Sequence, residues 1–247
     1  MAVTLQEQLF SWLSTDTKPA GVQNGAQGFE FPSMKDYFFY EGIWYPKPHL
    51  HLPATTVWTE ALVGTGSTII GVDWFQIESG TTASSTAIRR NGNGYTTMAG
   101  VQYDIIDWTK AIVFEFMLNS YTQTSTGIAR VTLGKATGAG YANPGVRSIG
   151  VRVSNLTLEG IVHDGTSLTA FGSLVLTDNI TYAIRLLSDG AGNVQLFSGS
   201  TRVGTTAAGP STTGTAGDNT VFLETGNGAN AAAYNFMVGN VRFGFGS

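Results

Sequence analysis

Apolar and polar residues alternate with a period of two through most of the chain after residue 60. Residues two apart in a strand point to the same face, so each run predicts a strand with one buried side. Asp164-Gly165, Asp189-Gly190 and Asn227-Gly228 lie between the runs and are typical of tight turns. No long helical segment intervenes, so the pattern predicts an all-β, antiparallel sandwich or barrel. The alternating apolar residues include Phe114, Phe116, Leu118, Ile149, Val151, Val153, Tyr182, Ile184, Leu186, Val194, Leu196, Val241, Phe243 and Phe245.

The N-terminus carries the best helical pattern in the chain. The stretch Thr4-Leu5-Gln6-Glu7 has the form of a capping box, which favours a short helix over about residues 5–14. A helix of this length does not persist alone in water. We therefore expect its apolar side to pack on the sandwich, a sister subunit or another protein. The apolar residues at helical spacing are Leu5, Leu9, Trp12 and Leu13.

Residues 15–60 differ in composition from the rest. Five of the chain's 7 prolines fall here, with aromatic residues between them. Repeated proline disfavours helices and central strands, whereas aromatic rings are rare in disordered chains. We expect an extended N-terminal arm or small subdomain that buries its rings against a neighbour. The predicted units are a helix-and-arm unit over 1–60 and a sandwich over 61–247. The assembly contacts are assigned to the helix residues and to Phe38, Phe39, Trp44 and Tyr45.

Charge and composition exclude several function classes. The 247 residues include 32 glycines and only 12% charged residues, with a net charge of -4. No basic run occurs, so nucleic acid is not an expected partner. No apolar stretch approaches the ~20 residues of a membrane span. The start lacks the basic and apolar regions of a signal peptide, so we expect synthesis in the cytoplasm. There is no cysteine, hence no disulfide.

One hairpin carries a resemblance to a known family. Its layout is Tyr182-x-Ile184-x-Leu186, Asp189-Gly190-x-Gly192-x-Val194-x-Leu196-Phe197, a turn at Ser198-Gly199-Ser200, then Val203-Gly204. This resembles a strand pair of laminin-G-like, concanavalin-type jelly rolls. Phe114-Glu115-Phe116 and the run from Ile149 to Val153 look like preceding strands, so the resemblance covers about residues 100–247. The asparagine often found in the family's second turn is absent. The resemblance implies a jelly-roll β-sandwich. The family includes lectins, receptor modules, glycosidases and virion surface domains, so its fold leaves function open.

Catalytic motifs are missing. A glycoside hydrolase needs two carboxylates facing one groove. Enzymes that look like the laminarinase type carry Glu-x-Asp-x-x-Glu, and this chain has no such string. The remaining acidic candidates are Asp104, Asp107 and Glu115, of which the first two are better explained as turn residues at a strand end. We expect no enzymatic activity and no catalytic residue.

A candidate metal site lies in Pro48-His49-Leu50-His51-Leu52-Pro53. In an extended segment His49 and His51 share a face. Three copies around a threefold axis would supply six nitrogens, a complete octahedral shell for a transition metal. This resembles the His-x-His device that clamps an iron on the axis of trimeric phage fibres and spikes. The alternative is two histidines on a partly exposed arm, and otherwise no cofactor is expected.

Tryptophans are the candidate sugar platforms, because flat rings stack on pyranose faces. The candidates are Trp58, Trp74 and Trp108, with Trp44 also considered. Packing in a core or an interface is the alternative for each ring.

The sequence therefore favours a non-enzymatic virion surface protein of a bacteriophage, a capsid decoration or fibre. A jelly roll of this kind normally works outside cells, and release by lysis reconciles this with the missing export signal. The expected partners are itself, as a homotrimer, other virion proteins docked through residues 1–60, and surface glycans. A carbohydrate-binding module and a glycan-cleaving enzyme remain as alternatives.

Overall fold

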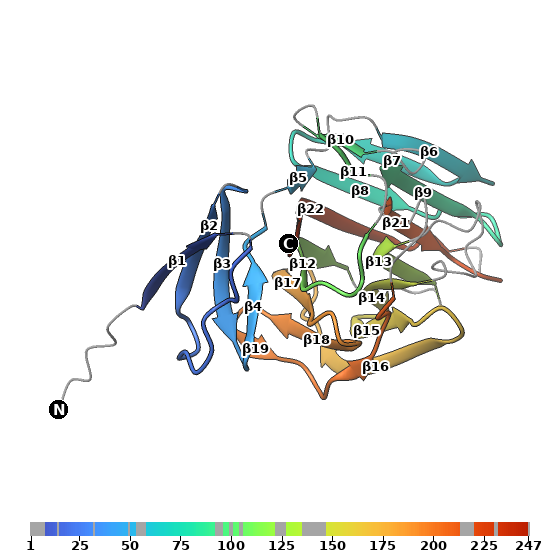
Figure 1. The fold of residues 1–247 in the computed structure, drawn as a ribbon. Helices are drawn as coiled ribbons and strands as arrows, with labels where there is room; N and C mark the ends of the chain where they lie inside the picture. The colour runs from blue at the N-terminus through green and yellow to red at the C-terminus, as the bar shows by residue number, and fades with distance from the viewer. Residues whose placement is uncertain are drawn as a thin grey trace.

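The computed structural model describes residues 8–13, 15–31, 33–48, 50–52, 58–91, 96–98, 101–103, 106–121, 127–134, 147–212, 220–229 and 232–246. These residues form strands and loops without a helix, and two large antiparallel sheets make a sandwich (Figure 1). The predicted all-β sandwich is confirmed. Within the same residues, no helix is long and apolar enough to cross a membrane.

We call the larger of the two sheets the front sheet. Its strands follow the order β19 (Thr201–Arg202), β18 (Asn193–Ser198), β17 (Thr181–Ser188), β12 (Ile112–Ser120), β22 (Asn235–Phe245), β8 (Trp74–Glu78) and β7 (Ser67–Ile70). In addition, β20 (Ala207–Ala208) pairs with β18, and β5 (Leu50–Leu52) pairs with β22.

The opposite layer is the back sheet. Its order is β16 (Leu168–Val175), β15 (Thr157–His163), β14 (Ser148–Ser154), β13 (Ile128–Gly134), β21 (Thr220–Gly226), β9 (Thr86–Asn91) and β6 (Trp58–Val63). The short strands β10 (Thr96–Met98) and β11 (Val101–Tyr103) form a separate hairpin.

The sandwich core follows the sequence alternation. On β12, Phe114, Phe116 and Leu118 are buried in the main apolar cluster, whereas Glu115 and Met117 are half-buried on the other face. Inward residues of the back sheet, such as Val131 on β13, complete the same cluster. The period of two thus fixes which side chains fill the core and which face outward.

The predicted helix is wrong over its described part, because Leu9–Leu13 form strand β1. Residues 1–7, including Leu5, lie outside the described residues. β1 runs parallel to β2 (Gln27–Phe31). The half-buried Phe10 and the buried Trp12 lie two residues apart and both contact Trp44, at ring-centroid distances of 5.7 and 5.0 Å. Long-range packing of these rings overrides the local helical spacing.

The region predicted to be an extended arm or a small subdomain builds a small sheet, here called the N-terminal sheet. Its described strands follow the order β1, β2, β3 (Lys35–Tyr40) and β4 (Ile43–Pro46). Proline does not prevent this, since Pro19 lies in a loop and Pro46 ends β4. After β4 the chain joins the front sheet at β5 and the back sheet at β6.

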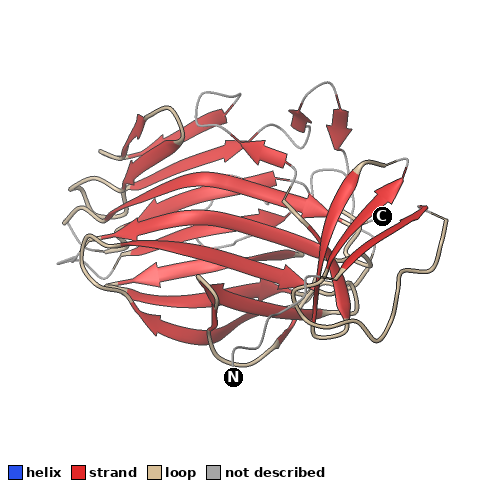
Figure 2. Cartoon of the chain, turned by 90° about the vertical axis from the view of Figure 1, so that its left-hand side faces the viewer, coloured by secondary structure: helices blue, strands red, loops and turns tan. Residues whose placement is uncertain are grey.

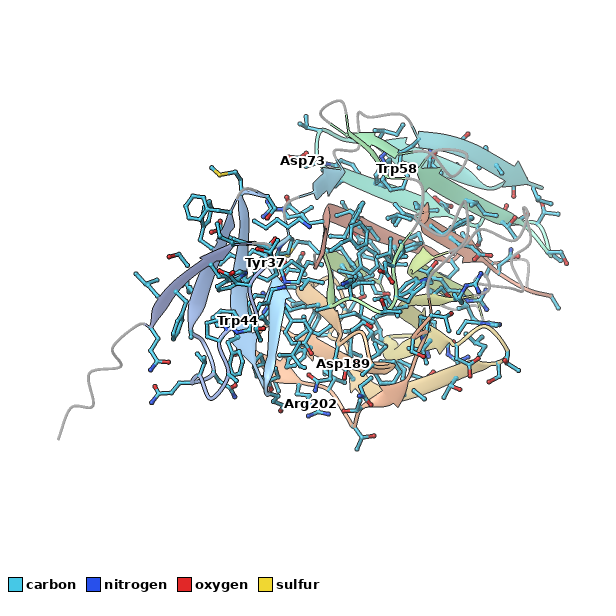
Figure 3. The ribbon with its side chains drawn as sticks, viewed as in Figure 1. Tyr37, Trp44, Trp58, Asp73, Asp189 and Arg202 are labelled. Carbon is cyan, nitrogen blue, oxygen red and sulfur yellow. The ribbon has the colours of Figure 1, made fainter. Side chains whose placement is uncertain are left out.

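One face of the N-terminal sheet has its own core. Its buried members are Trp12, Ala26, Tyr37, Phe39 and Trp44. The loop between β1 and β2 contributes to this core through Ala26 and the half-buried Val22. The Trp44 indole N–H donates to the carbonyl of Pro19 in that loop, at 2.8 Å. Both Tyr37 and Trp44 lie within this sheet in Figure 3.

The other face packs on the front sheet. Tyr45 is buried with Val113, Leu187 and Phe197 of the front sheet. A polar rim adds a bond from the Gln195 amide to the Glu41 carboxylate, 2.7 Å, besides the 3.5 Å ion pair of Glu41 with Arg202.

These contacts correct the expected role of the aromatic residues. Phe39, Trp44 and Tyr45 are buried inside one chain, and so is Trp12. Phe38 is half-buried and stacks on Tyr45 at 5.6 Å. The rings therefore need no second subunit to leave water. Of the residues assigned to assembly, Leu9 and Leu13 are the described ones that remain exposed, at 74% and 54%.

Candidate functional site

The outer face of the front sheet has a covered end and an open end. Along β12, Val113 lies under the N-terminal sheet, and Glu115, Met117 and Asn119 follow on the same face toward the open end. Figure 2 looks toward this face, with the N-terminal sheet standing over one end of the long strands. The open end is therefore the accessible part of this face.

A first hollow of about 260 Å³ lies on this face, across β17, β12 and β22. Glu115 lies on the middle strand, β12, opposite Arg185 on β17 and opposite Arg242 on β22. Glu115 and Arg185 form an ion pair. The hollow is lined by Glu115, Phe116, Met117, Ala183, Ile184, Arg185, Gly199, Asn240 and Arg242.

A second hollow of about 360 Å³ continues the first toward β8. The two share Met117 and Asn240, so they form one depression, which we call the groove. The second hollow is lined by Asp73, Trp74, Met117, Asn119, Thr181, Met237, Val238, Gly239 and Asn240. It is more apolar than the first, because Trp74 and two methionines lie together there.

Trp74 is placed at the groove by a tight turn. The Gly71 N–H donates to the Trp74 carbonyl at 2.9 Å, closing the connection between β7 and β8. A Cβ on Gly71 would lie 2.1 Å from Trp74 Nε1, so the indole rests against the bare backbone of this glycine. The Trp74 side chain remains 37% exposed. A ring held in this way can offer a surface to a ligand at low entropic cost.

Asn240 is placed at the junction of the two hollows by an irregularity in β22. The register between β12 and β22 shifts between Glu115 and Met117, opposite this residue. Asn240 has a φ of 50°, a conformation that asparagine tolerates better than most residues. Its N–H donates to the Asp73 carbonyl at 3.0 Å. The bulge thus ties the β8 turn to the middle of the groove.

The three candidate tryptophans differ in how far they are buried. Trp58 is 9% exposed and packs edge-on against Phe75 at 4.7 Å, and Trp108 is fully buried. Both lie in the sandwich core, where no sugar can reach their faces. Trp44 is likewise buried in the N-terminal sheet. Trp74 is the candidate that the structure places in the groove.

The acidic candidates do not form a catalytic pair among the described residues. Asp104 lies outside them. Asp107 accepts bonds from the N–H and hydroxyl of Thr109, at 3.0 and 2.6 Å, as expected of a turn residue. Glu115 does lie in the groove, but its carboxylate is paired with Arg185. Asp73 at the start of β8 is the groove acid that sequence reasoning missed (Figure 3).

Of the two histidines in the candidate metal site, one lies within the described residues. His49 lies outside them, and His51 pairs in register with Arg242 through β5 and β22. Elsewhere in the described ranges, no three His, Cys, Asp or Glu side chains gather as a metal site would require. The axial metal stays a prediction.

The sequence comparisons found no matching family model and no matching curated protein. Solved structures similar to this chain include the carbohydrate recognition domain of Emp47p, with 15% identity, a TM-score of 0.49, and coverage of 77% of this chain and 89% of that one. The potassium-bound carbohydrate recognition domain of Emp46p has 12% identity and a TM-score of 0.48, covering 75% of this chain and 87% of that one. The carbohydrate-binding module CBM66 from Bacillus subtilis has 9% identity and a TM-score of 0.44, covering 75% and 94%. All identities are far below 25%, and these likenesses leave the function open.

Proposed function

We propose that the protein is a non-catalytic glycan-binding β-sandwich whose binding site is the groove on the front sheet. The observation that carries the proposal is Trp74, which is 37% exposed in the lining of a hollow on the front sheet. Aromatic rings with one exposed face suit sugars, because pyranose C–H groups form an apolar surface.

Polar groups around Trp74 suit the hydroxyls of the same ligand. Asn119 and Asn240 line the second hollow, and an amide side chain both donates and accepts hydrogen bonds. Asp73 adds a carboxylate acceptor to the lining. An apolar platform with a few polar groups is the usual composition of a small-molecule site, and about 360 Å³ lies within the usual range of volumes.

The test is glycan binding by the full chain, first on an array and then by calorimetry. Trp74→Ala should weaken binding of the best glycan by about tenfold or more, and Trp74→Phe should restore part of it. Phe31→Ala is the matched control, because Phe31 is 45% exposed on the N-terminal sheet, away from the groove. Unchanged affinity of Trp74→Ala would contradict the proposal.

We also propose that the N-terminal sheet attaches the protein to a phage virion, as one of three subunits. The exposed Leu9 and Leu13 support an attachment role, since both lie on β1, which pairs in the described residues with β2 alone. The virion and the trimer rest on the resemblance stated above. Light scattering should give three copies for the wild type and one for Leu9→Ser/Leu13→Ser. A monomeric wild type would contradict the trimer, and with it the metal on His49 and His51, which elemental analysis of the trimer tests.

A further inference from the structure

We infer that the glycan is acidic, and that Arg242 in the first hollow binds its carboxylate or sulfate group. This inference rests on the proposed function and names the class of ligand for the same groove. It begins from a row of three charged residues that crosses the front sheet.

The row consists of Arg185 on β17, Glu115 on β12 and Arg242 on β22, in register with one another. The Glu115 carboxylate forms an ion pair with Arg185. The Arg185 guanidinium also lies 5.7 Å from the ring centre of Phe38 in the N-terminal sheet, which holds it at that side of the hollow. The row carries two positive charges and one negative charge, so its sum is positive.

Arg242 is the member of this row that the ion pair does not include. In the part of the chain that the structure describes, it has no ion pair and no side-chain hydrogen bond, although it lines the hollow. Most other arginines in that part are paired with a glutamate. These are Arg89, Arg130, Arg152, Arg185 and Arg202. In a chain of net charge -4, an unpaired guanidinium beside a carboxylate that is already occupied points to a ligand with negative charge.

The chemistry of arginine fits such a ligand. The planar guanidinium donates two parallel hydrogen bonds to a carboxylate or sulfate, which a neutral hydroxyl cannot match.

Arg242 also lies close enough to Trp74 for both to contact one glycan chain. Trp74 is opposite Gly239, three residues before Arg242 on β22, or about 10 Å along the strand. A sugar on Trp74 and a charged neighbour at Arg242 can therefore belong to the same oligosaccharide.

The experiment uses the full chain on an array of neutral and acidic glycans, with matched pairs in which one member carries the anionic group and the other has it blocked or removed. The pairs are polygalacturonate against its methyl ester, and a sulfated galactan against its desulfated form. We expect a charged member to bind about tenfold tighter than its neutral partner at low salt, and Arg242→Gln to remove that difference. The pair that responds identifies the anion as carboxylate or sulfate. Arg152→Gln is the control, because it removes the same charge from a half-exposed pair on the back sheet.

The outcomes separate this inference from the proposed function. Binding that depends on Trp74 but not on glycan charge, or charge-dependent binding that Arg242→Gln leaves intact, would overturn the inference and leave the glycan site standing. No binding to any glycan on the array would overturn both.

Discussion

The two ends of the front sheet's outer face differ in chemistry, although the same strands run through both. At the covered end, Val113, Leu187 and Phe197 are apolar and lie under the N-terminal sheet. At the open end, the same face carries Glu115, Asn119 and other polar side chains around Trp74. The covered end is a buried apolar interface, whereas the open end carries the groove.

This difference shows what the N-terminal sheet does for the fold. Without it, the apolar residues of the covered end would be a large exposed patch, which soluble proteins avoid. With it, apolar side chains that line the groove, such as Trp74 and Met237, stand among polar neighbours.

The largest effect is expected at the covered end. Tyr45 is 2% exposed between the two sheets, so Tyr45→Ala should lower the free energy of unfolding by about 3–5 kcal/mol through lost burial and a cavity. Urea denaturation measures this. Phe31→Ala, which removes a 45% exposed ring from the N-terminal sheet, should cost less than about 1 kcal/mol. Equal costs would mean that the N-terminal sheet does not dock on the front sheet.

A second prediction compares a buried charged pair with a half-exposed one, both on the back sheet. On the back sheet, Glu224 is 4% exposed and burial raises its pKa to about 7, despite Arg130 at 3.6 Å. A raised pKa means that the folded state holds a proton that the unfolded state releases above about pH 4.5. Stability should therefore fall as pH rises from about 4.5 to 7, by roughly 3 kcal/mol from this group.

Glu224→Gln should remove that part of the pH dependence, as urea denaturation at pH 4.5, 6 and 7.5 will measure. The matched control is Glu159→Gln, from the half-exposed pair with Arg152 on the same sheet. A wild-type slope that survives in Glu224→Gln would contradict this, because the pH dependence would then come from another group.

A third prediction changes the position of the Trp74 ring at the open end without replacing Trp74. Gly71→Ala puts a Cβ where the Trp74 indole now lies, at 2.1 Å from Nε1, so the ring must move. Glycan affinity should fall by about tenfold, and the free energy of unfolding should change by about 1 kcal/mol or less. Val72→Ala in the same turn should leave affinity unchanged, because Val72 is 75% exposed and is not part of the groove lining.

The smallest effect is expected at the rim of the covered end. Glu41 pairs with Arg202 at 3.5 Å, and both side chains are about a third exposed or more, at 42% and 31%. Glu41→Gln should therefore cost less than about 1 kcal/mol in urea denaturation, and less still at high salt. A cost near that of Tyr45→Ala would mean that charge, rather than apolar burial, holds the sheets together.

The sandwich could be predicted because one face of each strand is buried and the other is not. In β12, Phe114 and Phe116 alternate with Glu115 and Met117. This alternation predicts both that the segment is a strand and which of its faces is buried. The N-terminal sheet lacks this signal. Tyr37 and Phe39 fill its own core, while Phe38 and Tyr40 pack toward the front sheet. Since both faces of this sheet are covered, both carry aromatic residues. The sequence therefore shows no alternation of apolar and polar residues there.

The site could be predicted only in part. Trp74 was one candidate among several tryptophans, and only the fold shows that Trp58 and Trp108 are interior. The role of Arg242 depends on its register with Glu115, which lies more than a hundred residues earlier, and on a shift in that register. No local pattern carries such information, because the pairing of distant strands is a property of the whole fold.

Hydroxyl-radical footprinting with the best glycan from the array tests the central claim most directly. Trp74, Met117 and Met237 line the groove, whereas Met34 is 69% exposed on the N-terminal sheet. Saturating glycan should protect the three groove residues from oxidation and leave Met34 unchanged. Unchanged oxidation in the groove, with protection of Met34 or of the back sheet, would contradict the account.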